Sequence, residues 1–213
     1  MTRITTYLFD LDGTLLDSVR LILDSYHHTL RVHGHPPRPD AHWLAGLGTP
    51  LRVQFQDWAH DGATLEAMIA TYREFNLGHH DQMARPYPGV VDVMRRLRAT
   101  GVRTALVTSK NRSGAERGLR LMGIAETIDH IVGADDVTHP KPHPEPVLQA
   151  LTRLGATAGE AVFIGDSVHD MESGRAAGVR TAAVLWGPFS RAELEHTKPD
   201  HWLERPEELL GLG

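Results

Sequence analysis

Two carboxylates directly follow an apolar segment in Tyr7-Leu8-Phe9-Asp10-Leu11-Asp12-Gly13-Thr14-Leu15. The segment, which begins at Ile4, is predicted to be a buried strand, so Asp10 falls at its carboxyl end, where open α/β sheets bind ligands. Residues two apart in an extended chain face the same side, so the carboxylates of Asp10 and Asp12 can converge on one metal ion. Gly13 then allows the backbone to turn sharply. An ordinary Asp-Gly turn after a strand is the alternative interpretation.

The composition limits the kind of protein this chain can be. Its 213 residues suit one domain, or a core domain that carries an insertion. A net charge of -5 without a basic block argues against nucleic acid or an anionic membrane as the main partner. The absence of cysteine excludes disulfides and thiolate chemistry, and it fits a cytoplasmic location. The chain enters its first strand at once, which argues against a signal peptide, and its apolar runs fall short of the roughly 20 residues of a membrane span.

Residues 17–85 show helical patterns. Apolar residues recur at helical spacing from Val19 to Leu30, and Gly34 is expected to end this helix. No strand is expected before Pro86. Further helices are expected over 40–47, 51–60 and 63–78. The pattern therefore predicts an all-helical cap, residues 17–85, inserted into a core made of residues 1–16 and 86–213.

From Pro88 onward, helices and strands alternate, which is typical of a parallel sheet covered by helices on both faces. The strands are expected over 102–107, 128–132, 161–165 and 180–185, with 201–203 as a candidate edge strand. The helices are expected over 88–100, 112–122 and 145–154, followed by one that ends before Gly178. The predicted fold class is α/β: a doubly wound, mostly parallel, Rossmann-like sheet with an inserted helical cap.

Four polar clusters follow strands of this predicted sheet or lie in the loops that leave them. They are Asp10 with Asp12, Thr108 with Ser109, Lys141, and Asp166 with Asp170. Because these loops share one edge of a doubly wound sheet, the clusters can meet in one cleft. Taken singly, each has an ordinary alternative, such as a solvated loop lysine, a strand-end cap or acids at a helix N-terminus. Their shared position makes a common site the better interpretation.

The clusters resemble the motifs of the haloacid dehalogenase-like hydrolase superfamily, in its phosphatase branch with a helical cap. Asp10-Leu11-Asp12-Gly13-Thr14 is similar to the first motif, Thr108-Ser109 to the second, Lys141-Pro142 to the third, and Gly165-Asp166-Ser167 with Asp170 to the fourth. The stretches 118–123, 141–146 and 165–170 resemble phosphoglycolate phosphatases and the bacterial pyrophosphatases related to them. Ser109 departs from the asparagine of many relatives, which bears on substrate placement rather than on the reaction.

The resemblance implies hydrolysis through an aspartyl-phosphate. Asp10 would attack phosphorus as an ionised carboxylate. Asp12 would protonate the leaving oxygen and then take a proton from the attacking water. Lys141 would act with them by neutralising the phosphoryl oxygens, which Thr108 and Ser109 would also bind.

The same resemblance implies a Mg²⁺ cofactor. Asp10, Asp166 and the backbone carbonyl oxygen of Asp12 would supply hard oxygen ligands of the kind that Mg²⁺ prefers. Asp170, in the first turn of the next helix, would lie behind these ligands or bind weakly.

The predicted cap contains a candidate substrate contact and several histidine pairs. Thr49 and Arg52 lie in a segment that resembles the loop with which relatives reach their substrate, although a simple turn between helices is the alternative. The pairs are His27 with His28, His33 with His35, and His79 with His80. Since no Cys or His set has zinc spacing, we expect these pairs to cover a solvated cap surface. His143 and His169 lie beside the predicted cleft and could contact substrate.

The sequence therefore predicts a Mg²⁺-dependent phosphatase for a small phosphorylated metabolite that enters between core and cap, with a phosphoglycolate-like monoester as the first expectation. Inorganic pyrophosphatase and a sugar-phosphate phosphatase or phosphomutase are alternatives on the same core. Dehalogenation is disfavoured because it would need neither Asp12 nor Asp166. A non-catalytic binding module is least favoured, since it could lose Asp10 or Asp12. No nucleic-acid or membrane partner is expected, and the chain could be a monomer or a homodimer.

Overall fold

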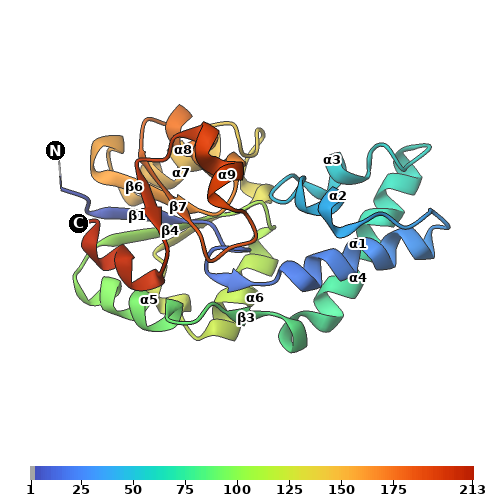
Figure 1. Cartoon of the computed structure of the whole chain (residues 1–213), viewed down its shortest axis with the longest axis horizontal. Helices are drawn as coiled ribbons and strands as arrows, with labels where there is room; N and C mark the ends of the chain where they lie inside the picture. The colour runs from blue at the N-terminus through green and yellow to red at the C-terminus, as the bar shows by residue number, and fades with distance from the viewer. Residues whose placement is uncertain (1–2) are drawn as a thin grey trace. The chain divides into compact units, whose positions relative to one another are not determined.

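The computed structural model describes residues 3–213, so the first two residues of the predicted core lie outside it. The chain forms two compact units. One consists of the residues up to Asp17 together with Arg85–Gly213, and the other is Ser18–Ala84. The first unit contains the large sheet, whereas the second contains helices (Figure 1). Within residues 3–213, the helices are too short or too polar to cross a membrane.

A six-stranded sheet lies at the centre of the first unit. Its order is β5-β4-β1-β6-β7-β8, and each neighbouring pair is parallel. The strands are β1 (Thr6–Phe9), β4 (Arg103–Val107), β5 (His130–Val132), β6 (Ala161–Gly165), β7 (Arg180–Val184) and β8 (His201–Leu203). All residues of β1 and β6 are buried, as expected for strands covered on both faces. The prediction of a doubly wound, mostly parallel sheet is confirmed.

Helices cover both faces of this sheet. Figure 1 shows α5 (Val90–Ala99) and α6 (Arg112–Met122) on one side, and α7 (Glu145–Leu154) and α8 (Val168–Ala176) on the other. Both α6 and α7 end at the predicted residues, and the glycine that follows each has a left-handed backbone, which provides a C-cap without a Cβ clash. The remaining elements are η1 (Ala125–Thr127), η2 (Ala134–Asp136), η3 (Ala158–Glu160), α9 (Arg191–Leu194), η4 (Glu195–Thr197) and η5 (Pro206–Gly211).

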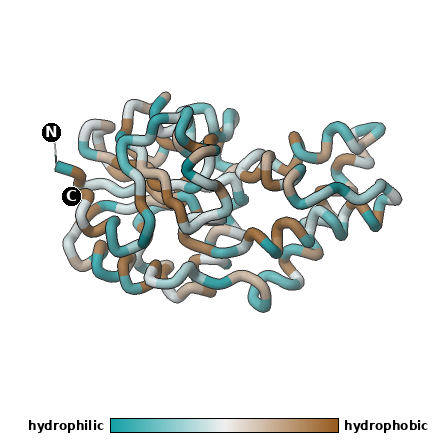
Figure 2. Tube along the Cα trace, viewed as in Figure 1, coloured by the Kyte–Doolittle hydropathy of each residue, from teal (hydrophilic) through white to brown (hydrophobic). Residues whose placement is uncertain are grey.

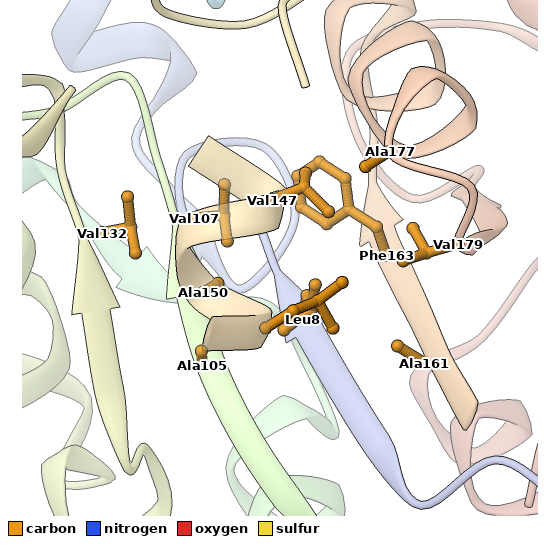
Figure 3. Close-up of a cluster of buried hydrophobic side chains, with 11 residues drawn as sticks. Leu8, Ala105, Val107, Val132, Val147, Ala150, Ala161, Phe163, Ala177 and Val179 are labelled. Atoms are coloured by element: carbon orange, nitrogen blue, oxygen red, sulfur yellow. The ribbon is translucent and has the colours of Figure 1, made fainter. Parts of the chain in front are cut away.

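Apolar side chains join the sheet to α7. Leu8, Val107 and Phe163 of three adjacent strands belong to one buried cluster with Val147 and Ala150 of the helix (Figure 3). Hydrophobic residues run along the strands of the sheet (Figure 2). This packing fixes the strand ends, and with them the loops that carry the predicted site residues.

The second unit is built around aromatic side chains. It comprises α1 (Val19–Val32), α2 (Asp40–Leu44), α3 (Leu51–Phe55) and α4 (Gly62–Met83). Each helix contributes one ring to a buried cluster of Tyr26, Trp43, Phe55 and Tyr72. Tyr26 stacks on Trp43 with ring centroids 4.3 Å apart. The cluster gives this small helical unit a core of its own.

The structure corrects the predicted helical region at one strand pair and at the ends of three helices. Leu16–Asp17 (β2) pairs antiparallel with Arg85–Pro86 (β3), so the expectation of no strand before Pro86 was wrong. Two-residue strands are too short to give an alternating pattern. Helices α2 and α3 are shorter than expected. Helix α4 continues through Gly78 to Met83, because a lone helical glycine need not end a helix.

His80 contradicts the prediction that the histidine pairs cover a solvated surface. It is only 1% exposed, and its Nδ1 lies 2.8 Å from a carboxylate oxygen of Asp81. The buried residues of α4 include Tyr72, Asn76 and His80, which share one face at four-residue spacing. The four-residue spacing from Tyr72 and Asn76, rather than the pairing with His79, therefore indicates that His80 is buried.

Candidate active site

The predicted site residues follow strands or lie in loops at the carboxyl edge of the sheet. Asp10 follows β1, Thr108 follows β4, and Asp166 follows β6. Lys141 comes from the loop between η2 and α7, and Asp170 from the first turn of α8. The parallel order of these strands explains why residues distant in sequence meet at this edge.

Lys141 links two of the carboxylates. Its Nζ donates to Asp10 Oδ1 at 2.9 Å and to Asp170 Oδ1 at 2.6 Å. It also lies 3.3 Å from the carbonyl oxygen of Val107. With Lys141 4% and Asp10 7% exposed, bulk water screens this ion pair weakly. The structure thus brings together the predicted nucleophile and the predicted phosphate-binding cation.

Asp170 accepts hydrogen bonds at both of its carboxylate oxygens. Its Oδ2 accepts from the backbone N of Ser167 at 3.0 Å and from the Ser167 hydroxyl at 2.6 Å, while Oδ1 accepts from Lys141. Ser167 and Asp170 together form a capping box at the start of α8. This arrangement makes Asp170 a support that orients Lys141.

Burial and mutual repulsion perturb the acids of the site. Burial raises the pKa of Asp10 to about 7, although the neighbouring Lys141 ammonium acts in the opposite direction. Burial, together with the carboxylates of Asp170 and Asp10, raises the pKa of Asp166 well above its usual range. Burial disfavours the charged form of Lys141, but Asp10 and Asp170 outweigh it and raise the pKa of the ammonium. The site therefore holds more acid than its lysine can neutralise.

The same carboxylates fit a divalent cation. Asp10, Asp166 and Asp170 each offer an oxygen, and these atoms lie within 4.8 Å of one another. Asp166 is 1% exposed, and its buried Oδ2 has no hydrogen-bond partner among the described residues. A buried carboxylate oxygen is costly unless a donor or a cation satisfies it. Hard oxygen donors in a cluster of excess negative charge suit Mg²⁺.

Two glycines make room for the Asp166 carboxylate. A Cβ on Gly13, whose φ is +88°, would lie 2.4 Å from Asp166 Oδ2. A Cβ on Gly187, in the loop after β7, would lie 2.6 Å from the carbonyl oxygen of Gly13 and 2.7 Å from Asp166 Cβ. Trp186 Nε1 also donates to the carbonyl oxygen of Thr14 at 2.8 Å, and the Thr14 hydroxyl donates to Asp166 Oδ1 at 2.8 Å. The loop after β7 therefore helps to position the metal-ligand candidate.

Gly187→Ala should displace this loop or Asp166, because the added methyl would meet backbone as well as side-chain atoms. We expect kcat to fall at least about tenfold and the free energy of unfolding to fall by about 1–3 kcal/mol. Phosphate-release kinetics and urea unfolding measure the two effects. Gly159→Ala is the matched control, since a Cβ there meets nothing within 4 Å. Unchanged activity and stability in Gly187→Ala would show that this contact does not hold Asp166.

Asp12 has a partner that the sequence analysis missed. Lys110 Nζ donates to Asp12 Oδ1 at 2.7 Å and to Oδ2 at 2.9 Å. Asp12 does not belong to the side-chain cluster of Asp10, Asp166 and Asp170. Two signals could have found Lys110: it directly follows Thr108-Ser109 at a strand end, and it is one of three lysines in an acidic chain. Trp186 and Gly187 could also have been found, because they follow a strand of the same sheet.

Thr108 and Ser109 follow β4, the strand next to β1 in the sheet. Thr108 is buried, and its hydroxyl oxygen accepts from the backbone N of Lys110 at 3.2 Å. In this arrangement the hydroxyl hydrogen can donate to a phosphoryl oxygen. Ser109 is partly exposed beside it.

Two further predicted contacts have other local partners. Arg52, in α3, forms an exposed ion pair with Glu66 of α4 inside the helical unit, and Thr49 lies just before α3. His143 is exposed, with its ring 4.7 Å from that of His139 and its Nδ1 accepting from the backbone N of Glu145. His169 lies in the first turn of α8, next to Asp170.

Known proteins resemble this chain over nearly its whole length. The family model for haloacid dehalogenase-like hydrolases matches residues 7–184. Pyrophosphatase PpaX from Bacillus cereus (strain G9842) is 42% identical over 210 residues, which cover 99% of this chain and 96% of that protein.

Solved structures share the fold closely. A protein from Bacteroides fragilis, assigned as a haloacid dehalogenase-like hydrolase, superposes with a TM-score of 0.90 at 30% identity, covering 97% of this chain and 100% of that one. A protein from Lactobacillus plantarum, assigned as a phosphoglycolate phosphatase, gives a TM-score of 0.87 at 27% identity, covering 100% of both chains.

Proposed function

This chain belongs to the haloacid dehalogenase-like hydrolases and is a phosphatase of that family, and from this premise we propose that it is Mg²⁺-dependent and acts through an aspartyl-phosphate at Asp10. The observation that carries the proposal is the buried contact of Lys141 with Asp10, next to Asp166 Oδ2, which has no hydrogen-bond partner within residues 3–213. A nucleophile, a phosphate-binding cation and a candidate metal ligand thus share one edge of the sheet.

In the first step, a carboxylate oxygen of Asp10 attacks phosphorus while the bond to the leaving oxygen breaks. Lys141 and the Thr108 hydroxyl bind the phosphoryl oxygens, and the backbone and side chain of Ser109 lie beside them. Asp170 keeps the Lys141 ammonium in place and ionised. These residues supply the positioning and charge stabilisation on which phosphoryl transfer depends.

Asp12 handles the proton in both steps. Its side chain enters the first step in the protonated form and gives that proton to the leaving oxygen, and the resulting carboxylate takes a proton from the attacking water in the second step. The water then displaces Asp10 from phosphorus and releases inorganic phosphate. Lys110 Nζ donates to both oxygens of Asp12, which does not belong to the side-chain cluster of Asp10, Asp166 and Asp170.

Asp10 and Asp166, with the backbone carbonyl oxygen of Asp12, are the proposed Mg²⁺ ligands. Bound Mg²⁺ would supply positive charge that offsets the repulsion between the carboxylates and the phosphoryl oxygens. Asp170 lies behind these ligands, since both of its oxygens already accept hydrogen bonds. The raised pKa values of Asp10 and Asp166 support the assignment, because a nearby cation would favour their ionised forms.

For the substrate, we infer inorganic pyrophosphate. The support is the relative named as a pyrophosphatase, which is 42% identical and matches nearly the whole chain. The structure assigned as a phosphoglycolate phosphatase is 27% identical, so phosphoglycolate becomes the second candidate. Sugar phosphates come third, because Lys110 places a second cation in a site that a neutral sugar would not need.

A parallel substrate screen tests this proposal. We expect kcat/KM to be at least about tenfold higher for pyrophosphate than for phosphoglycolate or a hexose phosphate. A chelator should abolish phosphate release, and added Mg²⁺ should restore it. Activity that survives chelation would contradict the metal requirement. A higher kcat/KM for phosphoglycolate or the hexose phosphate would contradict the substrate assignment.

A further inference from the structure

Lys110 is a second cation within the site. Its Nζ contacts both oxygens of Asp12, and the side chains of Lys110 and Asp12 are 15% and 17% exposed. Its backbone is held on both sides of the Cα atom: the N donates to Thr108 Oγ1 at 3.2 Å, and the O accepts from Ala134 N at 2.9 Å. The ammonium is therefore held in a defined place.

In the proposed mechanism, that place lies next to the leaving group. A group that protonates the leaving oxygen must come within about 3 Å of it, and Asp12 is the proposed group. Because Lys110 Nζ touches the same carboxylate at 2.7 and 2.9 Å, its charge lies close to the leaving oxygen as well. Lys141, by contrast, contacts Asp10 and thus serves the transferred phosphoryl group.

The ammonium can take a further ligand without losing Asp12. Lysine carries three N–H donors, and the structure assigns two of them to the Asp12 oxygens. The third donor can serve an anion beside Asp12. The chain has only three lysines, and two of them, Lys110 and Lys141, lie in this site.

We propose that Lys110 is a binding residue for an ionised group on the leaving side of the substrate, so that the enzyme selects substrates whose leaving group carries its own charge. This inference rests on the proposed function and deepens it. In pyrophosphate cleavage, the bond between the transferred phosphorus and the bridging oxygen breaks as the Asp10–phosphorus bond forms. The electron pair stays on the bridging oxygen, Asp12 gives that oxygen a proton, and Lys110 binds the departing phosphate.

The competing explanation is that Lys110 only positions Asp12. If Lys110 only positions Asp12, its replacement should lower kcat/KM for every substrate alike, since Asp12 acts on all of them. If Lys110 binds the leaving group, its replacement should lower kcat/KM far more for substrates with a charged leaving group than for those with a neutral one. Pyrophosphate and phenyl phosphate differ in this respect, because the phenyl group is uncharged in the substrate.

The test compares Lys110→Met with the wild type on both substrates. We expect kcat/KM for pyrophosphate to fall about 10- to 150-fold, the range for a lost hydrogen bond to a charged group, and kcat/KM for phenyl phosphate to fall less than about threefold. Lys110→Arg should recover much of the pyrophosphate activity, because it restores the cation. Lys198→Met, which removes the exposed lysine after η4, is the matched control.

Equal losses on the two substrates would overturn the binding role and leave positioning of Asp12. Phenyl phosphate turnover also reports whether the variant is folded. If the wild type releases phosphate from neither substrate, the proposed function fails, and Lys110 is then tested by binding alone. Pyrophosphate with Mg²⁺ should raise the thermal midpoint of the wild type more than that of Lys110→Met. Equal shifts would reject the inference independently of catalysis.

Discussion

Asp10→Asn should abolish phosphate release, lowering kcat by at least about 10⁴-fold, the scale on which loss of a nucleophile acts. The amide cannot form the acyl-phosphate bond at a useful rate. Its oxygen can still accept from Lys141, so the fold around the site should survive. Steady-state phosphate release from pyrophosphate and from phenyl phosphate, with saturating Mg²⁺, measures the loss.

The control for this variant is Asp92→Asn, which removes a largely exposed carboxylate on α5 that pairs with Arg96. It should retain wild-type kcat. Circular dichroism and the thermal midpoint show whether Asp10→Asn is folded. Phosphate release from a folded Asp10→Asn protein at more than about one-hundredth of the wild-type rate would exclude Asp10 as the nucleophile.

Asp166→Asn should also abolish activity, yet it should stabilise the protein in chelator. Asp166 Oδ2 is buried without a hydrogen-bond partner among the described residues, and two carboxylates lie nearby. An amide removes that charge and can donate to the neighbouring oxygens. The free energy of unfolding in chelator should therefore rise by about 1–3 kcal/mol, the usual cost of an unsatisfied buried group. Mg²⁺ should stabilise the wild type but not this variant.

The gain in stability should depend on pH. Asp10 and Asp166 have raised pKa values, so the folded protein binds more protons than the unfolded chain above the ordinary carboxyl range. The stability that these two groups contribute is thus complete at low pH. It is lost as pH rises toward their pKa values in the folded protein, about 7 for Asp10. Asp166→Asn should accordingly raise the free energy of unfolding, measured with urea, more at pH 8 than at pH 5. A loss of stability at pH 8 in chelator would contradict this account.

Sequence patterns predicted the sheet well because its strands are buried on both faces. Ala161–Gly165 is an unbroken buried run, and α6 and α7 end at glycines that mark left-handed caps. The same reasoning failed for β2 and β3, because a two-residue pair leaves no period to detect. It also failed for His80, where pairing with His79 drew attention away from the four-residue spacing that buries the residue.

The site residues could be selected from sequence because strand ends of a parallel sheet converge. Their contacts could not be predicted, since they join residues far apart in the chain. Lys110 and Asp12 are separated by 98 positions, and Lys141 and Asp10 by 131. No local pattern indicates which carboxylate each lysine will contact. The close approach of Gly187 to Gly13 and Asp166 likewise depends on the packing of two loops.

The central claim is that the phosphoryl group passes through Asp10, and trapping that adduct tests it most directly. Wild-type protein mixed with pyrophosphate and Mg²⁺, quenched in acid within one turnover and reduced with borohydride, should contain homoserine at position 10. Peptide mass spectrometry identifies the residue, and Asp10→Asn treated in the same way should show no such conversion. Conversion at another carboxylate, or full phosphate release with Asp10 never modified, would contradict the account.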